Sequence, residues 1–167
     1  ELNVRIIGVD GNPDVVNRHF VDSFHVVPMA STTPDDFVTA LLDICRKESV
    51  DIVLPGADEE VYALSGVKET FAGVGVTCAV QDPHTADLTR DKVLLFERLG
   101  EAGVSLPKFA AVSSAETIAA TAELLGYPKR RVIVKPRVGR GARGLIVIDA
   151  EVTEAQLGSE ARGYWTG

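Results

Sequence analysis

The sequence predicts an α/β protein in which a parallel sheet is followed by a strand–loop–strand hairpin. From residue 1 to about residue 82, apolar runs typical of buried strands alternate with segments whose apolar residues recur at helical spacing. Strands that alternate with helices in this way indicate a parallel sheet with crossover helices. Further along, two apolar runs, Val132–Val134 and Leu145–Ile148, flank a loop rich in glycine and arginine.

Three buried strands are expected in the first part of the chain, at residues 4–9, 51–54 and 74–80. In open α/β sheets, functional groups collect at the carboxyl ends of the strands. Acidic residues follow the first two strands, so the candidate substrate-binding residues are Asp10, Asp58, Glu59 and Glu60. Two alternatives stay open. Asp10 can cap its own turn, and the other three acids can begin a helix whose dipole they complement.

Helix starts are marked by capping residues. Thr33-Pro34, with two acids behind them, predict one helix start, with Phe37, Leu41 and Ile44 on its buried face. A polar linker is expected at 84–90. A second helix should follow it from residues 89–92 and end near Gly103. Residues 109–112 suggest a short strand, and residues 113–116 form a capping box for a helix that ends at 126–128.

Composition limits the classes of function. The net charge of −7 over 167 residues argues against general nucleic-acid binding, which depends on neutralised phosphates. Positive charge is instead concentrated in one segment of fourteen residues, which contains Arg130, Arg131, Lys135, Arg137, Arg140 and Arg143. Such local charge favours a small anionic ligand. No apolar run approaches the ~20 residues of a membrane span. Neither the two cysteines nor the three histidines show metal-like or triad-like spacing, so we expect free thiols in a reducing, cytoplasmic setting.

The glycine loop is the clearest chemical feature. Gly139 to Gly144 match G-x-G-x-x-G, and their few Cβ atoms and strong positive charge suit a polyphosphate. A dinucleotide-binding turn needs a helix after this motif, whereas Leu145–Ile148 continue as a strand. The context therefore favours two strands joined by a phosphate-binding loop. Lys135, between a β-branched strand and a proline, is expected to face a ligand or solvent.

The order of motifs is similar to that of a known family. Asp91-Lys92 open a helix that ends near Pro107, and Val134-Lys135-Pro136 then lead into the glycine loop. Together with the Pro55–Glu60 turn, this arrangement resembles the ATP-grasp ligases, especially their carbamoyl-phosphate-synthase-like branch. The resemblance implies a Rossmann-like pre-ATP-grasp domain over 1–85, whose first strand would precede residue 1. It also implies the first α+β subdomain of the ATP-grasp domain over 86–167, with an antiparallel glycine-loop hairpin.

The resemblance also implies roles for particular residues. Lys92 would lie near the α-phosphate of ATP, and Lys135 would bridge the α- and β-phosphates. The loop over the β- and γ-phosphates would consist of Gly139, Arg140, Gly141, Ala142, Arg143 and Gly144. The residues that hold Mg²⁺ are expected outside this chain, and no metal ligand is assigned. From the residues alone, Lys92 can equally be an ordinary solvated helix residue.

The family's chemistry is the ATP-dependent joining of a carboxylate, or bicarbonate, to an amine or ammonia through an acyl phosphate. A chain that supplies part of the ATP site is not expected to turn over alone. One rival function is a dinucleotide-binding oxidoreductase domain, which predicts a helix directly after Gly144. Another is a nucleotide-binding module without catalysis. The sequence fixes neither the substrates nor the oligomeric state, for which a homodimer is one option.

Overall fold

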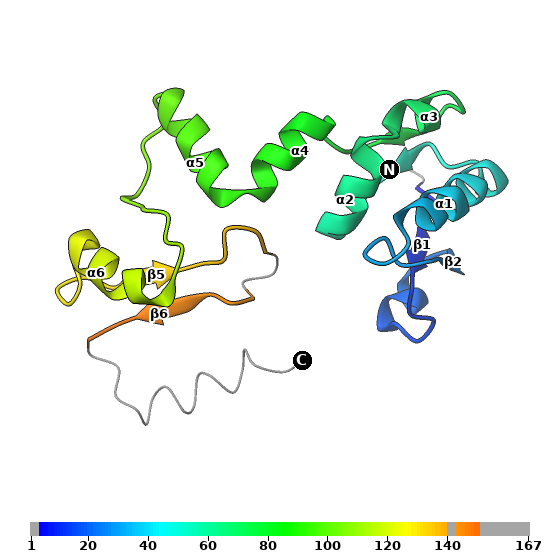
Figure 1. The fold of residues 1–167 in the computed structure, drawn as a ribbon. Helices are drawn as coiled ribbons and strands as arrows, with labels where there is room; N and C mark the ends of the chain where they lie inside the picture. The colour runs from blue at the N-terminus through cyan, green and yellow to red at the C-terminus, as the bar shows by residue number, and fades with distance from the viewer. Residues whose placement is uncertain (1–3, 140–142, 151–167) are drawn as a thin grey trace. The chain divides into compact units, whose positions relative to one another are not determined.

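The computed structural model describes residues 4–139 and 143–150. The chain packs into two compact units, Glu1–Asp87 and Leu88–Gly167, each of which has its own secondary structure (Figure 1). The expected assignment of 1–85 to a pre-ATP-grasp domain and of 86–167 to the first part of an ATP-grasp domain stays a prediction.

The first unit holds two pairs of parallel strands. β1 (Ile7–Asp10) pairs with β2 (Ser23–Val26), and β3 (Ile52–Val53) pairs with β4 (Thr77–Cys78). The connections are the short 3-10 helix η1 (Val16–Phe20), then α1 (Pro34–Glu48), and then α2 (Asp58–Ser65) with α3 (Lys68–Ala72). Parallel strands joined by helices confirm the α/β class expected from the alternation of patterns.

A single hydrophobic core holds the first unit together. Leu64 of α2 and Phe71 of α3 are fully buried, and burial of such a side chain contributes about 1.5–3 kcal/mol. α1 buries Phe37, Leu41 and Cys45 at four-residue spacing, so Cys45 takes the buried position expected for the half-buried Ile44. Both cysteines are free; burial and the nearby Cys78 thiol raise the pKa of Cys45 to about 11.

The strands are shorter than their apolar runs. β1 begins at Ile7 rather than at residue 4, because the side chain of Asp22 accepts the Ile6 N–H at 2.7 Å and removes it from the ladder. β3 ends at Val53, before Pro55, whose nitrogen has no hydrogen to donate. β4 is reduced to two residues, and Val76 beside it packs in the core without a ladder partner.

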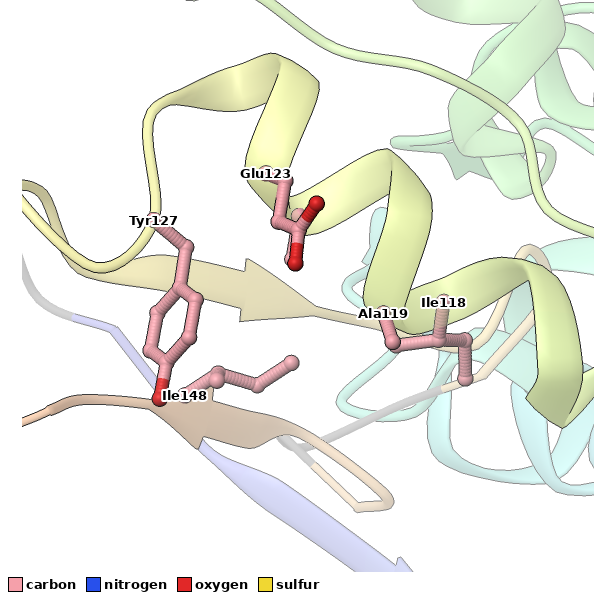
Figure 2. Close-up of a pocket in the computed structure, with 6 residues that line it drawn as sticks. Ile118, Ala119, Glu123, Tyr127 and Ile148 are labelled. Atoms are coloured by element: carbon pink, nitrogen blue, oxygen red, sulfur yellow. The ribbon is translucent and has the colours of Figure 1, made fainter.

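The second unit contains two helices and a hairpin. α5 (Lys92–Glu101) and α6 (Ala115–Leu125) precede β5 (Val132–Val134) and β6 (Ile146–Ile148), which pair antiparallel with Val132 opposite Ile148. Figure 2 shows a pocket between α6 and β6, lined by Ile118, Ala119, Ala122, Glu123, Tyr127 and Ile148. The antiparallel pairing confirms the expected hairpin. A strand after the glycine loop removes the oxidoreductase alternative, which required a helix there.

The type of structure was predicted wrongly for two segments. The expected linker at 84–90 is helix α4 (Pro83–Arg90), whose first turn is capped by Asp82: its carboxylate accepts from the Thr85 N–H at 2.9 Å and from the Thr85 hydroxyl at 2.7 Å. The expected strand at 109–112 is irregular, and the ring of Phe109 instead packs edge-on against Phe96 at a centroid distance of 5.0 Å. In the described part of the chain, no helix has the length and apolar character needed to cross a membrane.

Candidate functional site

The start of α5 is fixed by one carboxylate. Asp91 is the N-cap of this helix, and its Oδ1 accepts hydrogen bonds from the N–H of Val93 at 3.0 Å and of Leu94 at 3.2 Å. These bonds satisfy two of the donors that a helix leaves open at its N-terminus. Lys92, the next residue, therefore stands on an ordered first turn.

Lys92 meets the beginning of the glycine loop. Its main-chain N–H donates to the carbonyl of Arg137 at 3.0 Å, and its ammonium Nζ donates to the carbonyl of Gly139 at 3.2 Å. The two segments are 47 residues apart in the sequence, and the fold of the second unit brings them together. Of the residues expected to bind phosphates, Lys92 and Gly139 are thus in direct contact.

Arg137 ties the same two segments through its side chain. Its guanidinium Nε donates to Oδ2 of Asp91 at 2.6 Å. Partial burial works to raise the pKa of Asp91, but hydrogen bonds from Leu94, Arg137 and Val93 together hold that pKa below its ordinary value. The carboxylate therefore stays ionised and keeps both its helix cap and its arginine partner at neutral pH.

The loop begins and ends close to Pro136. At Gly144, φ is +72° and an added Cβ would lie 2.8 Å from Pro136 Cγ, so only glycine fits there without strain. An added Cβ on Gly139 would meet Pro136 Cβ at 3.4 Å, which is ordinary contact. Lys135 and Arg143 are exposed at the two ends of this segment. The predicted loop residues Arg140, Gly141 and Ala142 lie outside the described residues.

The candidate substrate residues have local partners in the first unit. Asp10 ends β1, and its Oδ1 accepts from the N–H of Asn12 at 2.8 Å, so it does cap its own turn. Glu60 Oε2 accepts from the N–H of Gly56 at 2.8 Å and thereby fixes the start of α2. Asp58 is exposed at the first position of that helix, and Glu59 is half-buried behind it.

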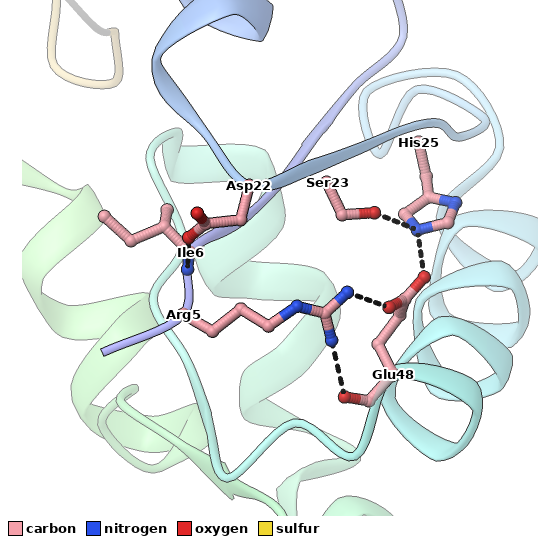
Figure 3. Close-up of polar contacts among 6 residues, drawn as sticks. All are labelled: Arg5, Ile6, Asp22, Ser23, His25 and Glu48. Carbon is pink, nitrogen blue, oxygen red and sulfur yellow. Dashed lines mark hydrogen bonds and ion pairs between the residues drawn. The ribbon is translucent and has the colours of Figure 1, made fainter. Parts of the chain in front are cut away.

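A polar cluster in the first unit was not predicted from the sequence (Figure 3). Glu48, at the end of α1, accepts from Arg5 at 2.6 Å and contacts Nε2 of His25 at 2.8 Å, while the Ser23 hydroxyl lies 3.3 Å from the same nitrogen. A catalytic triad needs both ring nitrogens of its histidine, one for each partner. This arrangement uses one, so the cluster joins α1 to β2 and to the segment before β1.

Acidic groups suited to a metal are not gathered among the described residues. No group of three or more histidine, cysteine, aspartate or glutamate side chains there has a geometry that would hold an ion. The Asp91 carboxylate, which lies at the glycine loop, accepts hydrogen bonds from the start of its own helix and from Arg137.

Comparison with known proteins shows what the chain is similar to. Residues 1–79 match the family model described as PylC-like, N-terminal domain. Over 150 residues, 89% of this chain, it is 30% identical to the formate-dependent phosphoribosylglycinamide formyltransferase of Synechococcus sp. (strain CC9605). Over 161 residues it is 24% identical to the arginine-specific carbamoyl phosphate synthase large chain of Bacillus subtilis (strain 168), covering 94% of this chain. These matches agree with the resemblance of the motif order to the ATP-grasp ligases.

The fold is also similar to that of a solved structure. The biotin carboxylase of Campylobacter jejuni, solved as a β-γ-ATP complex, superposes with a TM-score of 0.57 at 20% identity, covering 87% of this chain and 32% of that one. The ATP-grasp relatives are much longer than this sequence. It spans 35% of the formyltransferase and 14% of the carbamoyl phosphate synthase chain.

Proposed function

We propose that this chain supplies the first part of the ATP site of a ligase that joins a carboxylate, or bicarbonate, to an amine or ammonia. The observation that carries the proposal is the contact of the Lys92 ammonium with the Gly139 carbonyl at 3.2 Å. This contact brings together a cation and the start of a glycine loop, the two features that suit a polyphosphate, from positions 47 residues apart in the sequence.

The roles of the site residues follow from charge and access. Lys92 would neutralise the α-phosphate, and Lys135, exposed at the end of β5, would bridge the α- and β-phosphates. The backbone N–H groups from Gly139 to Gly144 can approach the β- and γ-phosphates closely, because glycine carries no side chain. The arginines of the same loop, Arg140 and Arg143, would add charge where the phosphoryl group departs.

When bound, ATP supplies the phosphoryl group that turns the carboxylate into an acyl phosphate, and the amine then attacks the acyl carbon and releases phosphate. The names of the two related enzymes fit this chemistry, since one is formate-dependent and the other is a carbamoyl phosphate synthase. Asp10, Asp58, Glu59 and Glu60 would hold the amine substrate, because carboxylates attract ammonium groups and repel another carboxylate. Mg²⁺ would accompany ATP on ligands outside this chain, in a cytoplasmic enzyme.

The test is replacement of Lys135 in the full-length protein. Lys135→Ala should abolish measurable ATP binding by calorimetry and remove ATP-dependent ADP release, because the α- and β-phosphates lose their bridging cation. Lys129→Ala is the matched control, since Lys129 is also an exposed lysine of the second unit but lies in the turn after α6. It should leave both measurements unchanged.

The outcomes separate the remaining functions. Unchanged nucleotide affinity in Lys135→Ala would refute the role of that lysine. ATP binding by the wild-type protein with no ADP release, over a panel of carboxylates and amines, would instead favour a non-catalytic nucleotide-binding module.

A further inference from the structure

We propose that the ion pair between Asp91 and Arg137 is a latch that positions Lys92 at the glycine loop and thereby sets the affinity for ATP. Arg137 then acts through Lys92, without touching the nucleotide. This inference rests on the proposed ATP site and assigns that site two positioning residues. The name latch is used below for this ion pair alone.

The first support is the density of contacts between two short segments. Asp91 and Lys92 reach Arg137 and Gly139 by three different bonds: side chain to side chain, main chain to main chain, and ammonium to main chain. The distances are 2.6 Å for Asp91 Oδ2 to Arg137 Nε, 3.0 Å for Lys92 N to Arg137 O, and 3.2 Å for Lys92 Nζ to Gly139 O. The ion pair therefore sits directly beside the bonds that place Lys92.

The second support is the way in which Asp91 divides its two oxygens. Oδ1 accepts from the N–H groups that begin α5, and Oδ2 accepts from Arg137. One carboxylate thus fixes the helix start and the loop start to each other. The Asp91 side chain is 16% exposed and the Arg137 side chain 57%, so this charge-assisted bond is shielded from water on the carboxylate side alone.

The third support is the charge balance at Arg137. The sequence leaves open whether this arginine, two residues after Lys135, binds phosphate itself. In the structure its Nε is already bound to Asp91, and a carboxylate beside a phosphate site repels the ligand unless a cation neutralises it. The ion pair therefore explains why a carboxylate can lie beside a phosphate site and what the positive charge of Arg137 does there.

The test measures ATP affinity for Asp91→Asn, Arg137→Gln and the double variant of the full-length protein. Asparagine caps helices about as well as aspartate, so Asp91→Asn removes the charge while α5 keeps its cap. Each single variant should weaken ATP binding about tenfold, and the double variant should be no weaker than either single one, because coupled residues are not additive. Arg137→Lys, which keeps a cation for Asp91, should recover part of the affinity.

A second readout does not depend on ATP. The Lys92 N–H donates to the Arg137 carbonyl, so its hydrogen exchange should become several-fold faster in both single variants, as local opening becomes easier. Arg98→Gln is the matched control, because it breaks an exposed pair with Glu101 on the same helix. It should change neither the exchange of Lys92 nor the affinity for ATP.

Other results of these experiments would contradict the latch, the proposed function, or both. Weaker binding in Arg137→Gln with unchanged or tighter binding in Asp91→Asn would mean that Arg137 touches phosphate, and would overturn the latch. A double variant about a hundredfold weaker, or unchanged Lys92 exchange in both single variants, would overturn it as well. If the wild-type protein does not bind ATP, both the proposed function and the latch are wrong. If Lys135→Ala abolishes ATP binding but Asp91→Asn leaves the affinity unchanged, only the latch is wrong.

Discussion

At the scale of single residues, the chain uses carboxylates to join segments that are distant in sequence. Glu48 joins the end of α1 to Arg5 and to His25, and Asp91 joins the start of α5 to Arg137. Each carboxylate lies at the end of a helix, where the chain turns and a side chain can reach a neighbouring element. Removal of either charge should therefore loosen a connection between elements while the helix itself remains.

We predict that Glu48→Gln lowers the stability of the first unit at neutral pH. The stability of the variant should also change less than that of wild type as the pH falls. Hydrogen bonds from Arg5 and His25 hold the pKa of Glu48 below its ordinary value of 4.5. A carboxyl with a lowered folded-state pKa adds stability above its unfolded pKa and loses that contribution as the pH falls through the folded value. The measurement is urea unfolding of wild type and variant between pH 7 and pH 3.

The two stability curves should be separated at pH 7 and converge below pH 4.5, where the wild-type carboxylate becomes protonated. Glu101→Gln serves as the control, because its pair with Arg98 is exposed on both sides and contributes little. A constant gap between wild type and Glu48→Gln at every pH would show that the charge of Glu48 is irrelevant.

The sequence allowed some residues of the candidate site to be predicted, and not others. Lys92, Lys135 and the glycines stand in a recognisable order along the chain. The pairing of Arg137 with Asp91 had no such signal, since they are 46 residues apart and the bond exists only where the start of α5 meets the segment after β5. The contact of Glu48 with His25 was hidden for the same reason.

At the scale of secondary-structure elements, helices were predicted best where their ends carry chemistry of their own. The Thr33-Pro34 start of α1 and the αL glycine after α6, Gly126, both lie where expected, although the Thr33 side chain makes no capping hydrogen bond. α4 was missed because Ala86 is its one buried residue, which leaves no apolar stripe, although Asp82 and Pro83 gave a capping signal. Strand lengths failed because ladder pairing depends on a partner strand that local sequence does not contain.

The hairpin is the element that carries the glycine loop, and it is fastened at both ends. Beyond the last ladder pair, Arg131 and Asp149 form an ion pair with the aspartate almost fully buried. At the loop end, Gly144 turns with a positive φ against the ring of Pro136. The geometry of the loop thus depends on two local features that can be changed one at a time.

We predict that Gly144→Ala destabilises the second unit by about 1–2 kcal/mol, the usual cost of a left-handed backbone for a residue with a Cβ. The added Cβ would also lie 2.8 Å from Pro136 Cγ, so the proline must shift. The measurement is chemical unfolding followed by a probe in the second unit. Gly139→Ala is the matched control, because its Cβ would meet the same proline at an ordinary 3.4 Å, and equal effects of the two substitutions would contradict this account.

At the scale of the whole molecule, the two kinds of candidate residue fall in different units. The residues proposed for ATP all belong to Leu88–Gly167, and the acids proposed for the amine substrate all belong to Glu1–Asp87. The overall α/β plan could be predicted because burial of apolar faces imposes periodicity over many residues, so local errors average out. The function of the acids could not be predicted in this way. An acid in the first turn of a helix is expected even without a ligand, because its charge interacts favourably with the helix dipole.

This division leads to a prediction for Asp58, the exposed acid at the start of α2. Asp58→Asn in the full-length protein should raise the KM for the amine substrate several-fold, about the effect of losing one partly screened ion pair of 0.5–1 kcal/mol. The affinity for ATP should stay unchanged, because no residue of the second unit is altered. Steady-state kinetics with the amine varied at saturating ATP, together with calorimetric ATP binding, measure the two effects separately.

Asp36→Asn supplies the matched control, because Asp36 is also an exposed acid in the first turn of a helix of the first unit, α1. Both substitutions remove one charge that favours a helix N-terminus, so they should lower stability by similar small amounts. A change in KM confined to Asp58→Asn therefore assigns the effect to substrate and not to the helix. Equal KM values in the two variants would leave Asp58 with its structural role alone and return the amine site to the other acids of that turn or to residues beyond this chain.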